Sequence, residues 1–162
     1  MSARCLGGLE ARAPGPADEA FLATLYLETR PDLAALPVPR GVIEGIACHQ
    51  RQMQVDDYAR RYPALEDWLL LEARRPVGRV ALDRAGGGLR VVDLSVATAA
   101  RRRGIARAVL AALQVEHEWI ALRVRSDNVA ARRLYEGLAF TLLRDDGPTL
   151  ELCWRRAAAQ NE

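Results

Sequence analysis

The chain has 162 residues, half of them hydrophobic, which is enough to bury the core of one domain. Its 23 basic and 21 acidic residues leave a net charge of +2, which argues against a general nucleic-acid binder. Cys5, Cys48 and Cys153 lie far apart and form no C-x-x-C pair, which argues against a disulfide framework or a structural zinc site. No apolar run approaches the ~20 residues of a membrane span, and the N-terminus lacks the layout of a signal peptide. We therefore expect a reduced, cytoplasmic protein that binds neither nucleic acid nor membrane.

Hydrophobic periodicity in the first half predicts two helices and a β-hairpin. Apolar residues recur at helical spacing after Pro14-Gly15-Pro16, and Pro63 ends a second, more polar helix. The predicted elements are a strand over 4–13, a helix over 17–29, a loop containing Pro31 and Pro37-Val38-Pro39, a helix over 43–61, and strands over 66–73 and 77–83 with a turn at 74–76.

The second half alternates strands and helices. A turn over Ala85-Gly86-Gly87-Gly88 leads into a strand whose residues Val92, Leu94 and Val96 are expected on one face, with Val91, Asp93 and Ser95 on the other. The predicted elements are a strand over 89–97, a helix over 105–116, a strand over 119–125, a helix opened by Ser126-Asp127-Asn128, and a final hairpin of 140–143 and 149–154. This order predicts an α+β fold with a mixed, mostly antiparallel sheet, about four helices and one parallel strand pair.

The segment Arg101-Arg102-Arg103-Gly104-Ile105-Ala106 lies between a predicted strand and a predicted helix. That order directs several backbone N–H groups and a helix N-terminus at one point, which suits a phosphate or pyrophosphate. Gly104 lets the backbone approach a ligand that a side chain would block. The alternative interpretation is an ordinary helix start with solvated arginines.

This pattern resembles the GNAT superfamily of acyl-CoA-dependent N-acyltransferases. Arg101-x-x-Gly104-x-Ala106 matches the family's phosphate loop, Gln/Arg-x-x-Gly-x-Gly/Ala. Downstream, Asn128, Leu134-Tyr135-Glu136 and Phe140 resemble the family's Asn…Leu-Tyr-Glu-x-x-Gly-Phe segment, except that Ala139 replaces the usual glycine. If that position needs a positive φ, alanine strains it by ~1 kcal/mol.

The resemblance implies a GNAT-like domain over residues 1–156, followed by a C-terminal tail over 157–162. It implies an N-acetyltransferase that moves the acetyl group of acetyl-CoA to a primary amine by direct attack in a ternary complex, without a metal. The acceptor is a small-molecule or protein amine that the sequence does not identify, and the sequence allows a homodimer. A catalytically inactive module of the same fold, binding acyl-CoA or a protein partner, is the alternative function.

The resemblance also implies which residues bind the co-substrate. The backbone of the loop would hold the pyrophosphate, and the strand before it would pair with the pantetheine arm where the strand at Ala121 to Val124 splays away. The implied cofactor-binding residues are Leu94, Ser95, Val96, Arg101, Arg102, Arg103, Gly104, Ile105, Ala106, Arg107, Asn128 and Tyr135.

The implied catalytic residues include Tyr135 as the general acid for the departing thiolate, and the Val96 N–H as donor to the thioester oxygen. The general base stays open between Asp93, Glu28 and His49, in that order. Each residue also has a structural interpretation. Tyr135 could pack as a core tyrosine, Asn128 could cap a helix, and Glu28 could end one in solvent. Asp93 could pair with Arg90 or Arg123, whereas Gln50, Gln54 and Tyr58 form a polar stripe that either lines an acceptor cleft or faces solvent. His49 and His117 are isolated, which disfavours a metal role.

Overall fold

A mixed sheet with the strand order β1-β2-β3-β4-β5-β6-β8-β7 forms the centre of the molecule in the computed structural model, which describes residues 2–84 and 87–157. The strands are β1 Arg4–Leu6, β2 Leu9–Arg12, β3 Leu65–Glu72, β4 Arg75–Asp83, β5 Leu89–Val96, β6 Trp119–Arg125, β7 Thr141–Asp145 and β8 Thr149–Arg155. The helices are α1 Glu19–Glu28, α2 Pro31–Ala34, α3 Arg40–Arg61, α4 Ile105–Glu116 and α5 Val129–Gly137, with short 3₁₀ turns η1 Pro16–Asp18 and η3 Thr98–Ala100. The α+β fold is as predicted.

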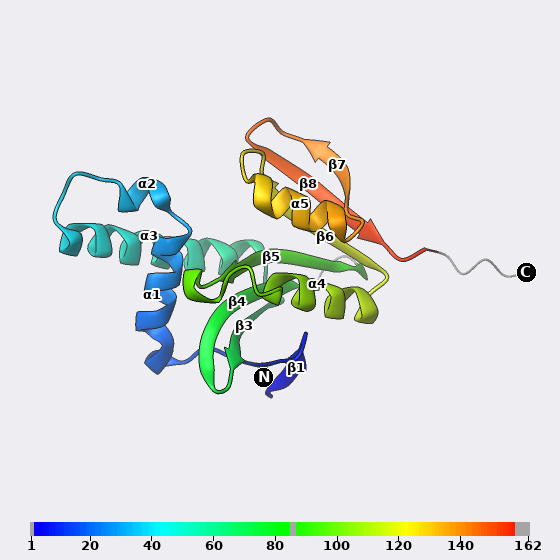
Figure 1. The fold of residues 1–162 in the computed structure, drawn as a ribbon, viewed down its shortest axis with the longest axis horizontal. Helices are drawn as coiled ribbons and strands as arrows, with labels where there is room; N and C mark the ends of the chain where they lie inside the picture. The colour runs from blue at the N-terminus through cyan, green and yellow to red at the C-terminus, as the bar shows by residue number, and fades with distance from the viewer. Residues whose placement is uncertain (1, 85–86, 158–162) are drawn as a thin grey trace, which may run out of the picture.

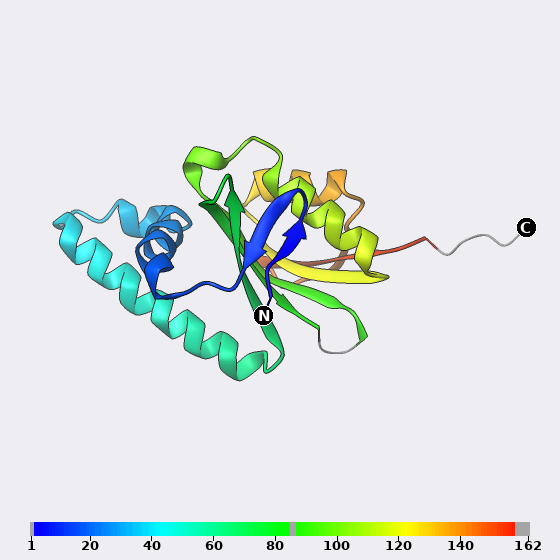
Figure 2. The same ribbon diagram turned by 90° about the horizontal axis from the view of Figure 1, so that it is seen from below.

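The two faces of the sheet carry different helices (Figures 1 and 2). On one face, α4 buries Val109, Leu110 and Leu113 in the main core, together with Leu70 and Val80 of the sheet. The stripe predicted for residues 105–116 explains this contact, and both that helix and the strand over 119–125 have the predicted bounds.

On the opposite face, α1 buries Leu22 against Leu69 and Leu71 of β3. Successive residues of a strand point to opposite faces, so β3 contributes to both cores. Helices α2 and α3 continue this layer through a small cluster of Leu33, Ile43 and Ala47. The molecule therefore has one apolar helix layer on each side of the sheet.

Several expected boundaries in the first half are wrong. Residues 4–13 form a hairpin of two short strands, because Gly7 and Gly8, with φ of 60° and 82°, reverse the chain. The proline loop contains the short helix α2, and α3 begins at Arg40, directly after Pro39. Ala85 and Gly86 of the predicted turn and residues 158–162 of the predicted tail lie outside the described residues.

A β-bulge in β5 corrects the expected alternation of that strand. Ala81 pairs with Asp93 but Leu82 pairs with Val91, which leaves Val92 as the extra residue. Val91 therefore lies in the α4-side core with Leu94 and Val96, and the grouping of Val92 with them is wrong. The bulge lies immediately before Asp93, whose side chain faces α1 and α3.

The parallel pairing of β5 with β6 is short. It joins Leu89 to Ile120, Arg90 to Ala121 and Val91 to Leu122, after which β6 continues only with β8. The two strands splay beyond this point. The expected splay over Ala121 to Val124 is thus too long by two residues, because Ala121 and Leu122 are paired.

Candidate functional site

The loop between β5 and α4 presents unpaired backbone N–H groups. Arg102 and Gly104 have φ of 61° and 78°, and Gly104 is the N-cap of α4. The first intrahelical donor is Ala108, whose N–H bonds to the Gly104 carbonyl at 2.9 Å. The N–H groups of residues 105–107 precede it and lie at the positive end of the helix dipole. This arrangement is suited to an anion.

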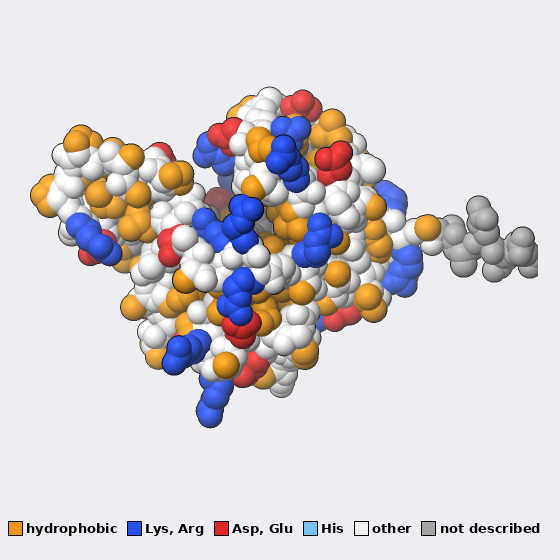
Figure 3. Space-filling model, viewed as in Figure 1, with side chains coloured by type: hydrophobic (Ala, Val, Ile, Leu, Met, Phe, Trp, Pro, Cys, Tyr) orange, Lys and Arg blue, Asp and Glu red, His pale blue; other side chains and the backbone are white. Residues whose placement is uncertain are grey.

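A cavity of about 270 Å³ lies over this loop. Val96, the loop and the first turn of α4 form one wall, and Ala130 and Leu134 of α5 form the other. Figure 3 shows basic side chains gathered around a hollow beside α5. The predicted loop residues and the predicted α5 segment therefore meet in space.

The arginine side chains of the loop have different partners. Arg101 Nε donates to the Val96 carbonyl at 2.9 Å, which ties the loop to the end of β5. Arg103 forms an ion pair with Glu72 at 2.7 Å and so turns toward β3. Arg102 and Arg107 line the cavity.

Glu28, the second candidate base, contacts the chain just before the loop. Its Oε2 accepts a hydrogen bond of 2.8 Å from the Thr98 N–H at the start of η3. This contact links the end of α1 to the β5–α4 connection. Glu28 does not line the small cavity beneath α1, described below, to which Asp93 contributes. The third candidate, His49, is exposed on α3.

The splay between β5 and β6 is a second opening, with a volume of about 190 Å³. The Ala97 N–H donates to the Val77 carbonyl of β4 at 2.9 Å. Because backbone groups of an antiparallel strand alternate between its two edges, those of Leu94 and Val96 point away from β4, with Leu94 lining this opening and Val96 lining the cavity over the loop. The opposite wall of the opening includes Asn128 and Tyr135.

Asn128 and Tyr135 both contribute to α5. Asn128 Oδ1 accepts a hydrogen bond of 3.1 Å from the Ala131 N–H, so Asn128 caps the helix and also lines the opening. The Tyr135 ring packs on Phe140 with 5.8 Å between centroids. Burial, reinforced by the charge of Asp93, raises the pKa of Tyr135 to about 12, so its hydroxyl is protonated at neutral pH.

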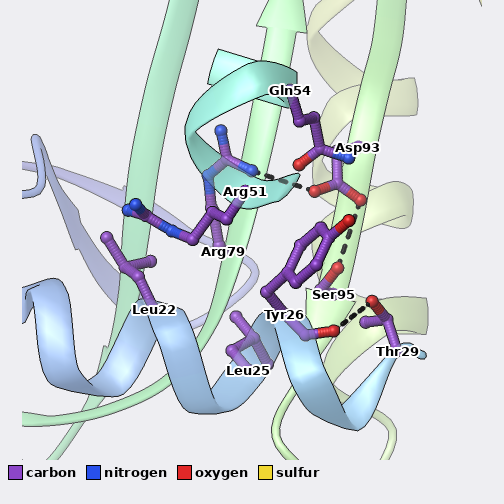
Figure 4. A pocket seen from close by; sticks show the side chains of 9 residues that line it. All are labelled: Leu22, Leu25, Tyr26, Thr29, Arg51, Gln54, Arg79, Asp93 and Ser95. Atoms are coloured by element: carbon purple, nitrogen blue, oxygen red, sulfur yellow. Dashed lines mark hydrogen bonds and ion pairs between the residues drawn. The ribbon is translucent and has the colours of Figure 1, made fainter. Parts of the chain in front are cut away.

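A third, smaller cavity of about 70 Å³ lies on the other side of β5 (Figure 4). Its floor is formed by Arg79, Asp93 and Ser95 of the sheet. Its walls are Leu22, Leu25, Tyr26 and Thr29 of α1 and Arg51 and Gln54 of α3. Asp93 lines this cavity and also the splay, so one carboxylate borders both openings.

Arg79 is the residue of this site that sequence reasoning missed. Its Nη1 lies 3.0 Å from Asp93 Oδ2, whereas the expected partners are engaged elsewhere, Arg90 with Glu151 and Arg123 with Asp146. Arg79 is opposite Ser95 in the β4–β5 register, so a correct register of the hairpin would have found it.

Two effects oppose each other at Asp93. Burial raises the pKa of its carboxyl above the ordinary value, and the positive charge of Arg79 and the Ser95 hydroxyl act against that rise. The net direction is upward, which favours proton uptake. Tyr58 of the predicted polar stripe lies near Asp93. Its burial, together with the negative charge of Asp93, raises the pKa of Tyr58 to about 12.

The rest of the stripe has mixed roles. Gln54 lines the small cavity, whereas Gln50 accepts a hydrogen bond of 2.7 Å from Arg30. Within the described part of the chain the three cysteines are free thiols, and no helix is long and apolar enough to span a membrane.

Part of the sequence matches a known protein family. Residues 65–142 match the family model described as an acetyltransferase (GNAT) domain. A search of curated proteins finds no matching sequence.

Solved structures share the fold over nearly the whole chain. The PaiA N-acetyltransferase from Thermoplasma acidophilum, in complex with coenzyme A, is 13% identical, with 96% of this chain and 100% of that chain covered and a TM-score of 0.65. An acetyltransferase from Thermus thermophilus is 18% identical, with 91% and 97% covered and a TM-score of 0.66. Ard1 from Thermoplasma volcanium is 18% identical, with 91% and 97% covered and a TM-score of 0.59.

Proposed function

We propose that this chain, whose residues 65–142 match the GNAT acetyltransferase model, is an N-acetyltransferase that moves the acetyl group of acetyl-CoA to a primary amine. In this proposal residues 1–156 form the acetyltransferase domain. The observation that carries it is the position of Asp93, which borders both the splay beside the phosphate loop and the small cavity under α1.

The loop and the splay suit the two parts of coenzyme A. Free N–H groups at residues 105–107 and the start of α4 suit the pyrophosphate. The backbone N–H and C=O of Leu94 and the N–H of Val96 can pair with an extended chain of amides, as a neighbouring strand would, whereas the Val96 carbonyl already accepts from Arg101. The PaiA structure, solved in complex with coenzyme A, supports the choice of ligand.

The chemistry needs a proton acceptor and a donor to the thioester oxygen. Asp93 would take the proton of the attacking amine, because burial raises the pKa of its carboxyl. The Val96 N–H, which has no β6 partner, would donate to the thioester oxygen as negative charge develops on it. The amine would approach from the cavity lined by α1 and α3.

Tyr135 would face the departing thiolate. A pKa of about 12 lies above the ordinary thiol value of about 8.5, so complete proton transfer from the phenol is uphill. A hydrogen bond from the neutral hydroxyl stabilises the thiolate without that transfer. We therefore assign Tyr135 as a hydrogen-bond donor to the leaving group.

Binding and turnover test the proposal separately. Coenzyme A at 100 times its Kd is expected to stabilise the protein by ~2.7 kcal/mol in a thermal shift assay. Absence of any shift would remove coenzyme A from the function. A panel of primary amines is then tested for release of the coenzyme A thiol.

Three variants assign the roles. Asp93→Asn and Tyr135→Phe are expected to lower thiol release by about 100-fold or more and about 10-fold or more, with coenzyme A affinity retained. Tyr62→Phe, at the C-terminal cap of α3, is the matched control and is expected to change neither. Coenzyme A binding without thiol release from any amine would support the inactive acyl-CoA-binding module instead.

A further inference from the structure

One buried arginine joins two carboxylates across three strands. Arg79 of β4 is 9% exposed, and its guanidinium contacts Asp67 of β3 on one side and Asp93 of β5 on the other. Nε and Nη2 of Arg79 donate to the two oxygens of Asp67 at 2.7 and 3.0 Å. Nη1 donates to a single oxygen of Asp93 at 3.0 Å.

The two carboxylates are not held equally. Asp67 receives a bidentate pair, the stronger geometry for arginine and carboxylate, whereas Asp93 receives one hydrogen bond from Arg79. The remaining oxygen of Asp93 accepts a hydrogen bond of 3.1 Å from the Ser95 hydroxyl. The group carries one positive and two negative charges, so one carboxylate is in excess. Asp93 is that carboxylate, because it is held by fewer charged contacts.

Asp67 lies on the strand beyond Arg79 and lines neither the splay nor the small cavity. Its strong pairing therefore serves Arg79 and not a ligand. An Arg79 that faced Asp93 alone would hold that carboxylate as a stable ion and make it a poor proton acceptor.

We propose that Arg79 and Asp67 are positioning residues for Asp93, in which Arg79 orients the carboxylate and Asp67 offsets enough of the arginine charge to keep Asp93 basic. This inference rests on the proposed function in one respect, namely that Asp93 is the base. Neither Arg79 nor Asp67 is required to touch the reacting atoms.

Other groups lie near Asp93, most of them lining the two openings that it borders, whereas Tyr58 has a pKa that the Asp93 charge raises. The neutral groups are Ser95 on its own strand, Tyr26 on α1, Gln54 and Tyr58 on α3, and Asn128 and Tyr135 at α5. The charged groups are Arg51 on α3 and Arg123 and Arg125 on β6, paired with Glu19, Asp146 and Asp127 respectively. Since these three arginines have carboxylate partners of their own, Arg79 is the cation that governs Asp93.

The test follows the titration of Asp93 directly, by ¹³C NMR of protein labelled at the aspartate carboxyl carbons. Asp93→Asn identifies the signal by removing it. Asp67→Asn is expected to lower the Asp93 midpoint by about one pH unit, because Arg79 then faces one carboxylate. Arg79→Gln is expected to raise the midpoint by about one pH unit or more. Damage to the fold alone does not move the midpoint in opposite directions.

Glu66→Gln is the matched control, since Glu66 of β3 pairs with Arg84 at 2.7 Å and does not contact Asp93. It is expected to leave the Asp93 midpoint unchanged. Asp67→Glu is expected to restore it. If Arg79→Gln does not fold, Asp67→Asn decides alone, and an unchanged or raised midpoint in that variant overturns the inference.

Turnover gives an independent readout. The acid limb of kcat/KM, measured with acetyl-CoA and the amine of fastest thiol release, is expected to move with the NMR midpoint in each variant. Shifted NMR midpoints with full activity in Asp93→Asn would reject Asp93 as the base and leave the charge arrangement intact. Unshifted midpoints with an inactive Asp93→Asn would reject the positioning role alone.

Discussion

The methyl group of Ala139, just after α5, affects the stability of the helix that carries Asn128 and Tyr135, because of the backbone conformation at that residue. Ala139 has a φ of 63°, the left-handed region, in which the Cβ of an L-residue crowds its carbonyl at ~1–2 kcal/mol. Glycine removes this strain but adds about 0.4–1 kcal/mol of entropy to the unfolded chain. The difference predicts that Ala139→Gly raises the free energy of unfolding by about 0.5–1 kcal/mol.

Thermal denaturation followed by circular dichroism measures this gain. For a chain of this length, each kcal/mol moves Tm by about 2–4 °C, so an increase of about 1–4 °C is expected. Ala23→Gly, inside α1, is the control and is expected to cost about 1 kcal/mol because its backbone is helical. A fall in Tm for Ala139→Gly similar to that of Ala23→Gly would refute the strain argument.

Two further predictions concern the phosphate loop and the pH dependence of stability. Gly104→Ala, at a φ of 78°, is expected to weaken coenzyme A binding by about tenfold in calorimetry because alanine strains that backbone. Arg103→Gln is expected to change the affinity by less than about twofold, since Arg103 pairs with Glu72. An equal loss in both would contradict binding through the backbone. The Arg12 guanidinium and the Gly15 N–H lower the pKa of Asp18 to about 2. The resulting stability is present above pH ~4 and is lost as the pH falls toward 2. The difference in Tm between the parent chain and Asp18→Asn is therefore expected to disappear as the pH falls from ~4 toward 2. A difference that stays constant would show that ionisation of Asp18 does not contribute to stability.

The sequence correctly predicted those helices and strands whose own residues carry a clear hydrophobic pattern. The helix over 105–116 has an uninterrupted apolar stripe, and the strand over 119–125 has Ile120, Leu122 and Val124 at alternate positions. The motif at residues 101–106 and the segment around Tyr135 could also be recognised in the sequence, because each is a short run of residues, and their roles in binding stay predictions. Their meeting across one cavity required the fold.

Features that depend on strand register were missed. The bulge at Val92 changes which side chains of β5 share a face, and nothing in the run of apolar residues marks it. Arg79 reaches Asp93 from 14 positions away along the chain, through the pairing of two strands. Arg90 and Arg123, the expected partners of Asp93, both pair with other acids, and only the strand register shows this.

The parallel pairing of β5 with β6, here called the seam, consists of three residue pairs. It joins the strands β1 to β5 to the strands β6, β8 and β7 at one end only, so the described sheet has two parts. Beyond the seam, the Leu94 and Val96 amides have no β6 partner and are expected to exchange with deuterium readily, whereas the Ala97 amide, bonded to Val77, is expected to be protected. An extended amide chain laid in the opening would slow exchange at alternate residues of β5 and join the two parts of the sheet into one cooperative unit. Rigidity of the whole sheet would then be a property of the complex and not of the chain alone.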